Sequence, residues 1–258
     1  MAESLLTALL LAVIQGITEW LPISSSGHLV LFERLFSYAG GLLFEVALHF
    51  GTLAAVFVYF GKDIVDMIRD FFSGKFKSSN GRMAIYLIIG TIPAVIVGFF
   101  ARDIFDSILS DLRIVALGFG ITGVFLLISS FANIKEGKLD FRKSLFVGFA
   151  QALAIVPGIS RSGSTIASGV LLGLNEKDAM RFSFLLSIPI IFGANLLTIG
   201  NNTLSPDLIW ASLVSFVVGL ITIHLMFNYL LVKREYFKWF GIYCILLGLV
   251  VFGFVLVF

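Results

Sequence analysis

Long apolar runs without a charged side chain constrain this chain more than any other feature. An α-helix needs about 20 apolar residues to cross the hydrocarbon core of a bilayer. Five uncharged runs meet this requirement, and a sixth is interrupted only by Glu45 and His49. They cover residues 83–101, 114–134, 182–206, 208–232 and 239–258 and, for the interrupted run, 42–60. Hydrophobic residues make up 59% of the chain and charged residues only 13%. This is too few charged side chains to cover the surface of a water-soluble globule. The sequence therefore predicts an all-α integral membrane protein with six transmembrane helices.

Two further apolar segments are interrupted where a spanning helix would continue. Residues 4–21 run into a polar stretch that contains Pro22, and a short apolar run follows at 29–36. Residues 144–157 end in a proline, and a short apolar run follows at 165–174. Proline interrupts a helix because it lacks a backbone N–H and its ring clashes with the preceding turn. We therefore expect each segment to form a re-entrant pair of half-helices.

Basic residues in short loops indicate which side of a membrane protein is cytoplasmic. Lys and Arg concentrate in the loops at 62–82, 135–143 and 233–238, which we expect on the cytoplasmic side. The loops at 102–113 and 201–207 together hold four acidic and two basic residues and are expected outside. This alternation requires that both short segments return to the side from which they enter. The resulting expectation is a multi-pass protein of the cell membrane (the inner or cytoplasmic membrane) with both termini outside.

The two halves of the chain share a weak repeat around the interrupted segments. At a shift of 136 residues, identical residue types coincide at Gln15 and Gln151, Ser24 and Ser160, Ser26 and Ser162, and Gly27 and Gly163. Each half then contains one re-entrant pair and three spans, and an odd number of spans inverts the second half relative to the first. We predict a single transmembrane domain, residues 1–258, built from an inverted-topology repeat of residues 1–134 and 138–258. Repeats of this kind place their broken helices, and the site, near the bilayer midplane.

Glu19 lies in the first interrupted segment, at a depth where a charge is costly. A carboxylate in the middle of the membrane costs about 2.5–3.5 kcal/mol on insertion scales. Glu19 therefore needs a metal ion, a cation or a proton as partner, unless it reaches the interface from the end of a helix. Gln15 lies one helical turn earlier and shares the same helical face.

Arg161 lies in the second interrupted segment, within the stretch PGISRSGST at residues 157–165. Two helix N-termini that meet at the midplane present free N–H groups and partial positive charge, which suit a phosphate. Arg161 adds a planar guanidinium that can bind phosphate oxygens in pairs. In the alternative interpretation, Arg161 only neutralises Glu19 and holds the two halves together.

The repeat is asymmetric at these charged positions. Ile155 aligns with Glu19, and Arg161 aligns with Ser25. One half therefore supplies a carboxylate and an imidazole, and the other supplies a cation. This division suits the hydrolysis of a phosphate ester or anhydride, because a cation and helix N–H groups stabilise the charge that develops on phosphate oxygens.

Both polar stretches resemble the signatures of a known family. The stretch QGITEWLPISSSGHL at residues 15–29 fits (E/Q)GxTE(W/F)LPxSSxGHL, and PGISRSGST at residues 157–165 fits PGxSRSGxT. Both signatures are typical of the undecaprenyl-diphosphatase family, the membrane phosphatases linked to bacitracin resistance, and the resemblance extends over nearly the whole chain. It implies removal of the terminal phosphate from undecaprenyl diphosphate, a C55 isoprenoid carrier, which recycles that lipid for cell-wall synthesis.

The resemblance also implies a role for each polar residue of the two stretches. Glu19 and Gln15 belong to the acidic motif, which implies a Mg²⁺ or Ca²⁺ requirement, and glutamine at position 15 leaves one carboxylate instead of two. Ser25 is the candidate nucleophile, or positions a water that attacks. His28 is a candidate general acid or base, and Arg161 is the candidate phosphate clamp. The expected substrate-binding residues are Gln15, Ser24, Ser26, Gly27, Ser160, Ser162, Gly163, Ser164 and Thr165.

The expected partners are a lipid diphosphate substrate and the bilayer, with no nucleic acid, because the basic residues form short clusters between apolar runs. The sequence sets no oligomeric state. A transporter or flippase of a phosphorylated lipid or other anion is the alternative function, since transporters use the same inverted repeats. The expected topology indicates a site reached from the outer face.

Glu45 and His49 share a helical face, and the repeat aligns Arg181 with Glu45. These residues are expected to form either a charge pair beside the site or caps at helix ends.

Overall fold

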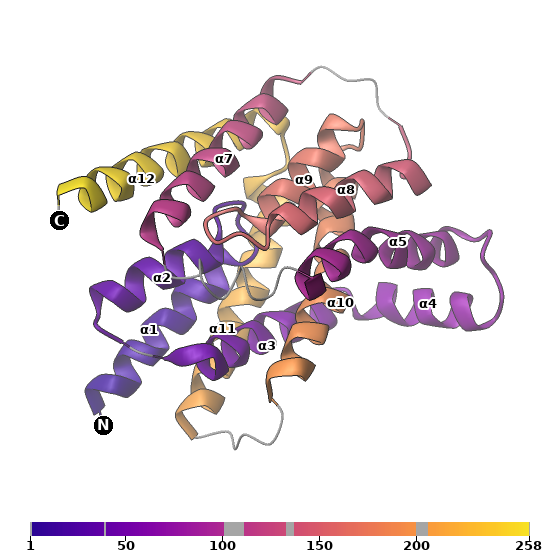
Figure 1. Cartoon of the computed structure of the whole chain (residues 1–258). Helices are drawn as coiled ribbons and strands as arrows, with labels where there is room; N and C mark the ends of the chain where they lie inside the picture. Colours follow the sequence, from indigo (N-terminus) through magenta and orange to yellow (C-terminus); the bar gives the residue numbers. More distant parts are fainter. Residues whose placement is uncertain (1, 39, 101–110, 133–136, 200–205, 258) are drawn as a thin grey trace.

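The computed structural model describes residues 2–38, 40–100, 111–132, 137–199 and 206–257. All regular elements in these ranges are helices (Figure 1), and six of them are long and apolar enough to cross a membrane. The six are α3 (Gly41–Tyr59), α5 (Ser79–Phe100), α7 (Leu112–Phe131), α10 (Glu176–Ile199), α11 (Pro206–Leu225) and α12 (Phe237–Val257). The prediction of an all-α chain with six spans is confirmed.

The ends of the spanning helices differ from the ends of the apolar runs. Helix α10 begins at Glu176 rather than at residue 182, because an acidic first turn is favourable at a helix N-terminus although it breaks the uncharged run. Helix α11 continues into a π-helical segment, Met226–Leu230, and a short 3₁₀ turn, Arg234–Tyr236, leads into α12. Residues 102–110 of the predicted 102–113 loop, residues 201–205 of the predicted 201–207 loop and the basic residue Lys135 lie outside the described residues.

Both interrupted segments form pairs of short helices. The first pair is α1 (Ala2–Thr18) and α2 (Ser25–Leu35), and the second is α8 (Phe141–Leu153) and α9 (Arg161–Leu171). In the second connection Gly158 has φ +88°, and an added Cβ there would lie 2.2 Å from the carbonyl oxygen of Val115 on α7. Only glycine fits this position, so the break before α9 is specified by the sequence and held by α7.

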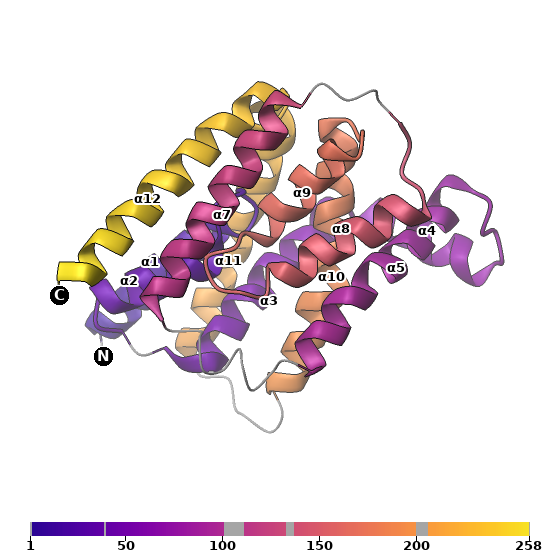
Figure 2. The same ribbon diagram turned by 45° about the horizontal axis from the view of Figure 1, so that its top comes forward.

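The helices pack in pairs that join distant parts of the chain. Helix α7 lies along α12, α3 along α11, α5 along α8, and α1 along α11 (Figures 1 and 2). Helices α7 and α12 meet at glycines: an added Cβ on Gly123 would lie 2.6 Å from the Gly241 carbonyl oxygen, and one on Gly241 would lie 2.8 Å from that of Gly123. Small residues at such crossings allow spanning helices to approach closely.

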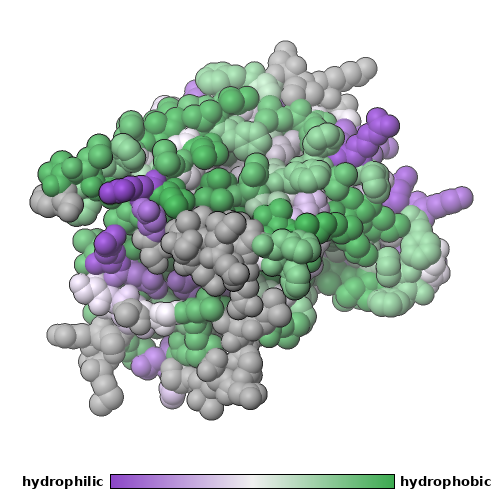
Figure 3. Space-filling model, in the orientation of Figure 1, coloured by the Kyte–Doolittle hydropathy of each residue, from purple (hydrophilic) through white to green (hydrophobic). Residues whose placement is uncertain are grey.

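The outer surface of the helices is apolar. Hydrophobic residues cover most of the described surface in the view of Figure 3, with hydrophilic residues gathered in separate patches. Phe99 and Phe100 of α5 and Phe131 of α7 are each more than three-quarters exposed. Apolar surface of this extent suits contact with lipid rather than water. The amphipathic helix α4 (Gly61–Phe72), between α3 and α5, also exposes Phe72.

The loops that carry the basic residues lie at a common end of the helices. Arg181 at the start of α10 donates through Nε to Asp63 of α4 at 3.0 Å. Arg234 before α12 donates through Nε to Glu176 at 2.9 Å. The backbone of Gly137, which precedes α8, donates to the carbonyl of Gly173 at 2.7 Å. These contacts bring the described parts of the 62–82, 135–143 and 233–238 loops together near the start of α10.

Candidate active site

The two polar stretches, far apart in the sequence, are in contact with each other. Ser162 at the start of α9 donates its hydroxyl to the Leu21 carbonyl, at an Oγ to O distance of 2.9 Å. An added Cβ on Gly163 would lie 3.2 Å from the carbonyl oxygen of Pro22, so the glycine permits this approach. The structure therefore brings the loop before α2 and the N-terminus of α9 into one site.

The helices α2 and α9 begin in the same way at this junction. The hydroxyl of Ser24 accepts the N–H of Gly27 at 3.3 Å, and that of Ser160 accepts the N–H of Gly163 at 3.0 Å. Serine is favoured at such N-cap positions because its oxygen satisfies a free N–H of the first turn. In both loops the capping hydroxyl also contacts that of the second serine along, at 3.3 Å for Ser24–Ser26 and 3.2 Å for Ser160–Ser162. Two helix N-termini, each with partial positive charge, therefore lie at the contact of the two loops.

Glu19 joins the two stretches through its carboxylate, which is only 5% exposed as a residue. Arg161 donates through Nη2 to Oε1 of Glu19 in a short charge-assisted hydrogen bond. Ser25 donates its hydroxyl to Oε2 at 2.6 Å, and Gln15 donates its amide to the same oxygen at 3.0 Å. Glu19 of the acidic motif therefore contacts both the candidate nucleophile, Ser25, and the candidate phosphate clamp, Arg161, as the family resemblance implied for one site.

His49 of α3 approaches the same carboxylate. Its Nε2 lies 3.5 Å from Oε2 of Glu19, and its Nδ1 bonds the Glu45 carbonyl at 2.8 Å. The sequence marked Glu45 and His49 as a polar pair in an otherwise apolar span, but it did not predict the contact with Glu19. Arg181, which the repeat aligned with Glu45, instead pairs with Asp63. The signal that could have found His49 is a titratable side chain in a spanning helix, because such groups in membranes usually serve a site.

Arg161 is held in place on two sides and retains a free donor. Its guanidinium carbon lies 5.5 Å from the centre of the Trp20 ring, which is fully buried and packs against Phe184 at a centroid distance of 4.9 Å. Nη1 of Arg161 is buried and has no hydrogen-bond partner among the described residues. A buried N–H without a partner is costly, so this donor is suited to an anionic ligand.

Gln15 carries a second polar atom without a partner. Its Oε1 is buried and has no hydrogen-bond donor in the described part of the chain, although its amide nitrogen binds Glu19. Its counterpart in the other half, Gln151, also has a buried Oε1 without a partner there. No cluster of three His, Cys, Asp or Glu side chains that could hold a metal ion occurs within the described residues.

His28 lies beside the junction with both ring nitrogens occupied. Nδ1 bonds the Ser24 carbonyl at 2.7 Å, and Nε2 bonds the hydroxyl of Tyr243 on α12 at 2.7 Å. Ser24 has φ +69°, a left-handed conformation that is unfavourable for residues other than glycine. The histidine therefore holds the carbonyl of a strained residue directly before Ser25.

Most of the remaining predicted binding residues are buried and bonded within the protein. Thr165 donates its hydroxyl to the Arg161 carbonyl at 2.7 Å and contacts the hydroxyl of Ser183 at 2.6 Å. Gly27 packs against Phe119, whose ring would lie 2.6 Å from an added Cβ. Ser164 is 5% exposed and lines an apolar groove. These contacts shape the loops and helix starts around the Glu19 carboxylate.

Comparison with known proteins places this arrangement in a family. The sequence profile of the bacitracin resistance protein BacA matches residues 8–250. A protein named undecaprenyl-diphosphatase from Korarchaeum cryptofilum is 38% identical over 256 aligned residues, which cover 95% of this chain and 97% of that protein. Proteins of the same name from Desulforudis audaxviator and Mycobacterium ulcerans are 41% and 39% identical, over 94% and 93% of this chain and 95% and 93% of their own lengths. The chain therefore belongs to the bacitracin resistance protein BacA family.

Proposed function

We propose that this protein hydrolyses undecaprenyl diphosphate to undecaprenyl phosphate and inorganic phosphate. The name undecaprenyl-diphosphatase of its full-length relatives supports this activity. The observation that carries the proposal is that the Glu19 carboxylate accepts hydrogen bonds from Ser25 of the first signature stretch and from Arg161 of the second. The reaction recycles the lipid carrier for cell-wall synthesis and provides resistance to bacitracin.

In the proposed site the phosphates of the substrate lie between the N-termini of α2 and α9. The free Nη1 of Arg161 and the N–H groups of these helix starts would donate to phosphate oxygens. Such fixed donors stabilise the charge that develops on the leaving oxygen and on the transferred phosphoryl group. Trp20, which lies against the guanidinium, keeps Arg161 in position.

The contact between Ser25 and Glu19 supports a serine nucleophile. A hydroxyl that donates to a carboxylate at 2.6 Å has its base already in place. Ser25 Oγ would attack the terminal phosphorus while its proton passes to Glu19, and the bond to the lipid monophosphate breaks as Glu19 returns that proton to the departing phosphate oxygen. Water would then attack the phosphoserine and give a proton to the ionised Glu19, and the bond from phosphorus to Ser25 Oγ breaks as Glu19 returns the proton to Ser25, releasing inorganic phosphate. His28, bonded to the Ser24 carbonyl, would orient Ser25 in this scheme, because both of its ring nitrogens are engaged.

Ser25→Ala tests the covalent route. With substrate labelled on its terminal phosphate, we expect acid-quenched wild-type protein to retain labelled phosphate and the Ser25→Ala protein to retain none. Ser129→Ala on α7 is the matched control and should keep the label, because the buried Ser129 hydroxyl donates to the Leu126 carbonyl and lies outside both signature stretches. An unlabelled wild-type protein together with normal turnover of Ser25→Ala would instead establish direct attack by water.

The residues present fit a divalent cation that shares its ligands with the substrate. Glu19 offers a carboxylate and Gln15 an amide oxygen without a partner in the described part of the chain, both oxygen donors of the kind that Mg²⁺ and Ca²⁺ prefer. Two protein ligands suffice for Mg²⁺ where phosphates of the substrate supply others. When bound, the cation would supply neutralisation of the diphosphate charge.

Removal of the cation should therefore stop the reaction. We expect a chelator to lower phosphate release by about 10²-fold or more, with recovery on addition of Mg²⁺ or Ca²⁺. Gln15→Glu adds a second carboxylate and should lower the Mg²⁺ concentration for half-maximal activity by about tenfold. Gln151→Glu, at the corresponding position of the other half, should leave that concentration unchanged. Full activity in the chelator would remove the cation from the proposal.

The architecture that we propose around this site is an inverted repeat with two re-entrant helix pairs, α1–α2 and α8–α9, in a single domain of residues 1–258. The packing supports it, because α1 lies along α11 of the other half as α8 lies along α5. The pairs α3–α10 and α7–α12 also join equivalent helices of the two halves. Repeats 1–134 and 138–258 would then be related by a two-fold axis in the membrane plane.

The proposed orientation follows from the basic loops that gather at one end of the helices. That end would face the cytoplasm of a cell whose inner membrane holds the protein. The α1–α2 pair would then enter from outside, so the site would be reached from the outer face. A carrier or flippase remains the second candidate function, because broken helices in inverted repeats also serve transport. Reconstituted protein that exchanges labelled lipid across the bilayer without releasing phosphate would favour the carrier.

A further inference from the structure

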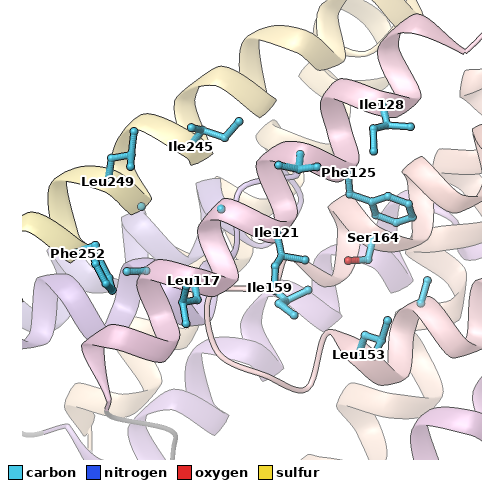
Figure 4. A pocket seen from close by; sticks show the side chains of 15 residues that line it. Leu117, Ile121, Phe125, Ile128, Leu153, Ile159, Ser164, Ile245, Leu249 and Phe252 are labelled. Carbon is cyan, nitrogen blue, oxygen red and sulfur yellow. The ribbon is translucent and has the colours of Figure 1, made fainter.

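An apolar groove of about 730 Å³ opens between α7, α8, α9 and α12 (Figure 4). This volume falls within the range of about 300–1,000 Å³ that is usual for ligand pockets. Of the 15 residues that line it, only Ser164 has a polar side chain. The groove therefore suits an apolar chain and not a second polar ligand.

The groove lies beside the N-terminus of α9, where the proposed phosphate site begins. Ile159 and Ser164 line it, and both belong to the second signature stretch, on either side of Arg161. Ser164 is the third residue after Arg161 in α9, so the two lie on neighbouring faces of the same first turn. A lipid whose phosphates bind at the N-terminus of α9 would therefore have the start of its chain at the mouth of this groove.

The residues of α7, α8 and α12 that line the groove are exposed and suit contact with lipid. Leu117 and Ile121 of α7, Leu153 of α8 and Leu249 of α12 line the groove and are each more than half exposed. Gly120 of α7 lies among them, and an added Cβ there would meet no atom within 4 Å. The first atom of a side chain at position 120 would therefore meet no neighbour, and glycine leaves this space free.

We propose that this groove binds the isoprenoid chain of the substrate, over the units nearest the diphosphate. The inference rests on the proposed function, since the chain in question is that of the C55 diphosphate. The position of Ile159 and Ser164 on either side of Arg161 favours this occupant over the acyl chain of a membrane phospholipid. The groove is large enough for only part of a C55 chain, and the remainder lies in the surrounding lipid.

Gly120→Leu tests the groove directly, because the leucine side chain would occupy it. In protein reconstituted in lipid bilayers, we expect KM for undecaprenyl diphosphate to rise about tenfold or more, with kcat within about twofold of wild type. KM for isopentenyl diphosphate, which has a single isoprene unit, should change much less. Gly193→Leu on α10 is the matched control, because an added Cβ there also meets nothing within 4 Å and Gly193 does not line the groove.

Equal KM values of Gly120→Leu and Gly193→Leu for the C55 substrate would overturn the groove assignment. Absence of phosphate release by the wild-type protein would overturn the proposed function instead. A second measurement on the wild-type protein needs no folded variant: a C55 diphosphate with a photoreactive group in its first isoprene units should label residues 117–121 and Leu153. Displacement of this label by excess phospholipid, but not by unlabelled C55 diphosphate, would assign the groove to acyl chains and contradict the proposal.

Discussion

Glu19→Gln should lower kcat for phosphate release from undecaprenyl diphosphate by about 10³-fold, within the range attributed to a general acid or base. Glutamine has nearly the shape of glutamate, so its carbonyl oxygen can still accept from Arg161 or from Ser25. It cannot accept a proton from Ser25, and it lacks the charge that a divalent cation requires. Steady-state phosphate release, with circular dichroism and thermal unfolding to verify the fold, measures the effect.

The ion pair between Glu176 and Arg234, which lies outside the site, offers a matched control for this substitution. Glu176 accepts from Arg234 Nε at 2.9 Å, and both side chains are 18% exposed. Glu176→Gln therefore weakens an ion pair between the start of α10 and the turn before α12. The substitution does not touch the site, so kcat should stay within about threefold of wild type. Equal activity of the two variants would show that Glu19 has no part in the chemistry.

The spans could be predicted from the sequence because the bilayer imposes a length and an apolar composition on each of them. The ends of the spans could not be predicted in the same way. Charged first turns, such as Glu176 and Asp178 in α10, belong to the helix but break the apolar run. The start of α9 at Arg161 rather than at residue 165 has a related cause, since the capping hydroxyl of Ser160 begins the helix within the polar stretch.

The contact between Glu19 and Arg161 could be anticipated from electrostatics. A charge of either sign is costly at membrane depth, and the repeat placed the two residues in corresponding segments, so each was the natural partner of the other. Gln15 could be placed beside Glu19 because it lies one helical turn earlier on the same face. The sequence did not predict the contact of Ser25 with Glu19, which depends on the loop between α1 and α2.

The histidines could not be assigned without the structure. The family resemblance implied His28 as a candidate general acid or base, whereas the sequence indicated His49 only as part of a polar pair with Glu45 in a span. The packing of α3 against α1, α10 and α11 turns His49 toward Glu19, and α12 supplies Tyr243 as a partner for His28. Helix rotation depends on contacts among elements far apart in the chain, which periodicity alone does not specify.

Arg161→Lys should lower kcat/KM by about 10²-fold or more, and Arg161→Ala by about 10³-fold or more, since an arginine on a transferring phosphoryl group contributes effects of this size. Lysine keeps the positive charge beside Glu19 but loses the planar fork that binds two phosphate oxygens. Alanine also leaves the buried carboxylate of Glu19 unpaired, so the lysine variant is the cleaner test of the phosphate contact. Arg234→Lys is the control and should retain kcat/KM.

The two roles of Arg161 can be separated by inhibition with inorganic phosphate. If the free Nη1 binds a phosphate oxygen, the inhibition constant for phosphate should rise about tenfold or more in Arg161→Lys. Measured in a chelator, so that no cation contributes to phosphate binding, Glu19→Gln should change this constant far less, because it leaves the guanidinium in place. An unchanged inhibition constant in Arg161→Lys, with the fold intact, would mean that the arginine serves only to neutralise Glu19 and to hold α9 against the first polar stretch.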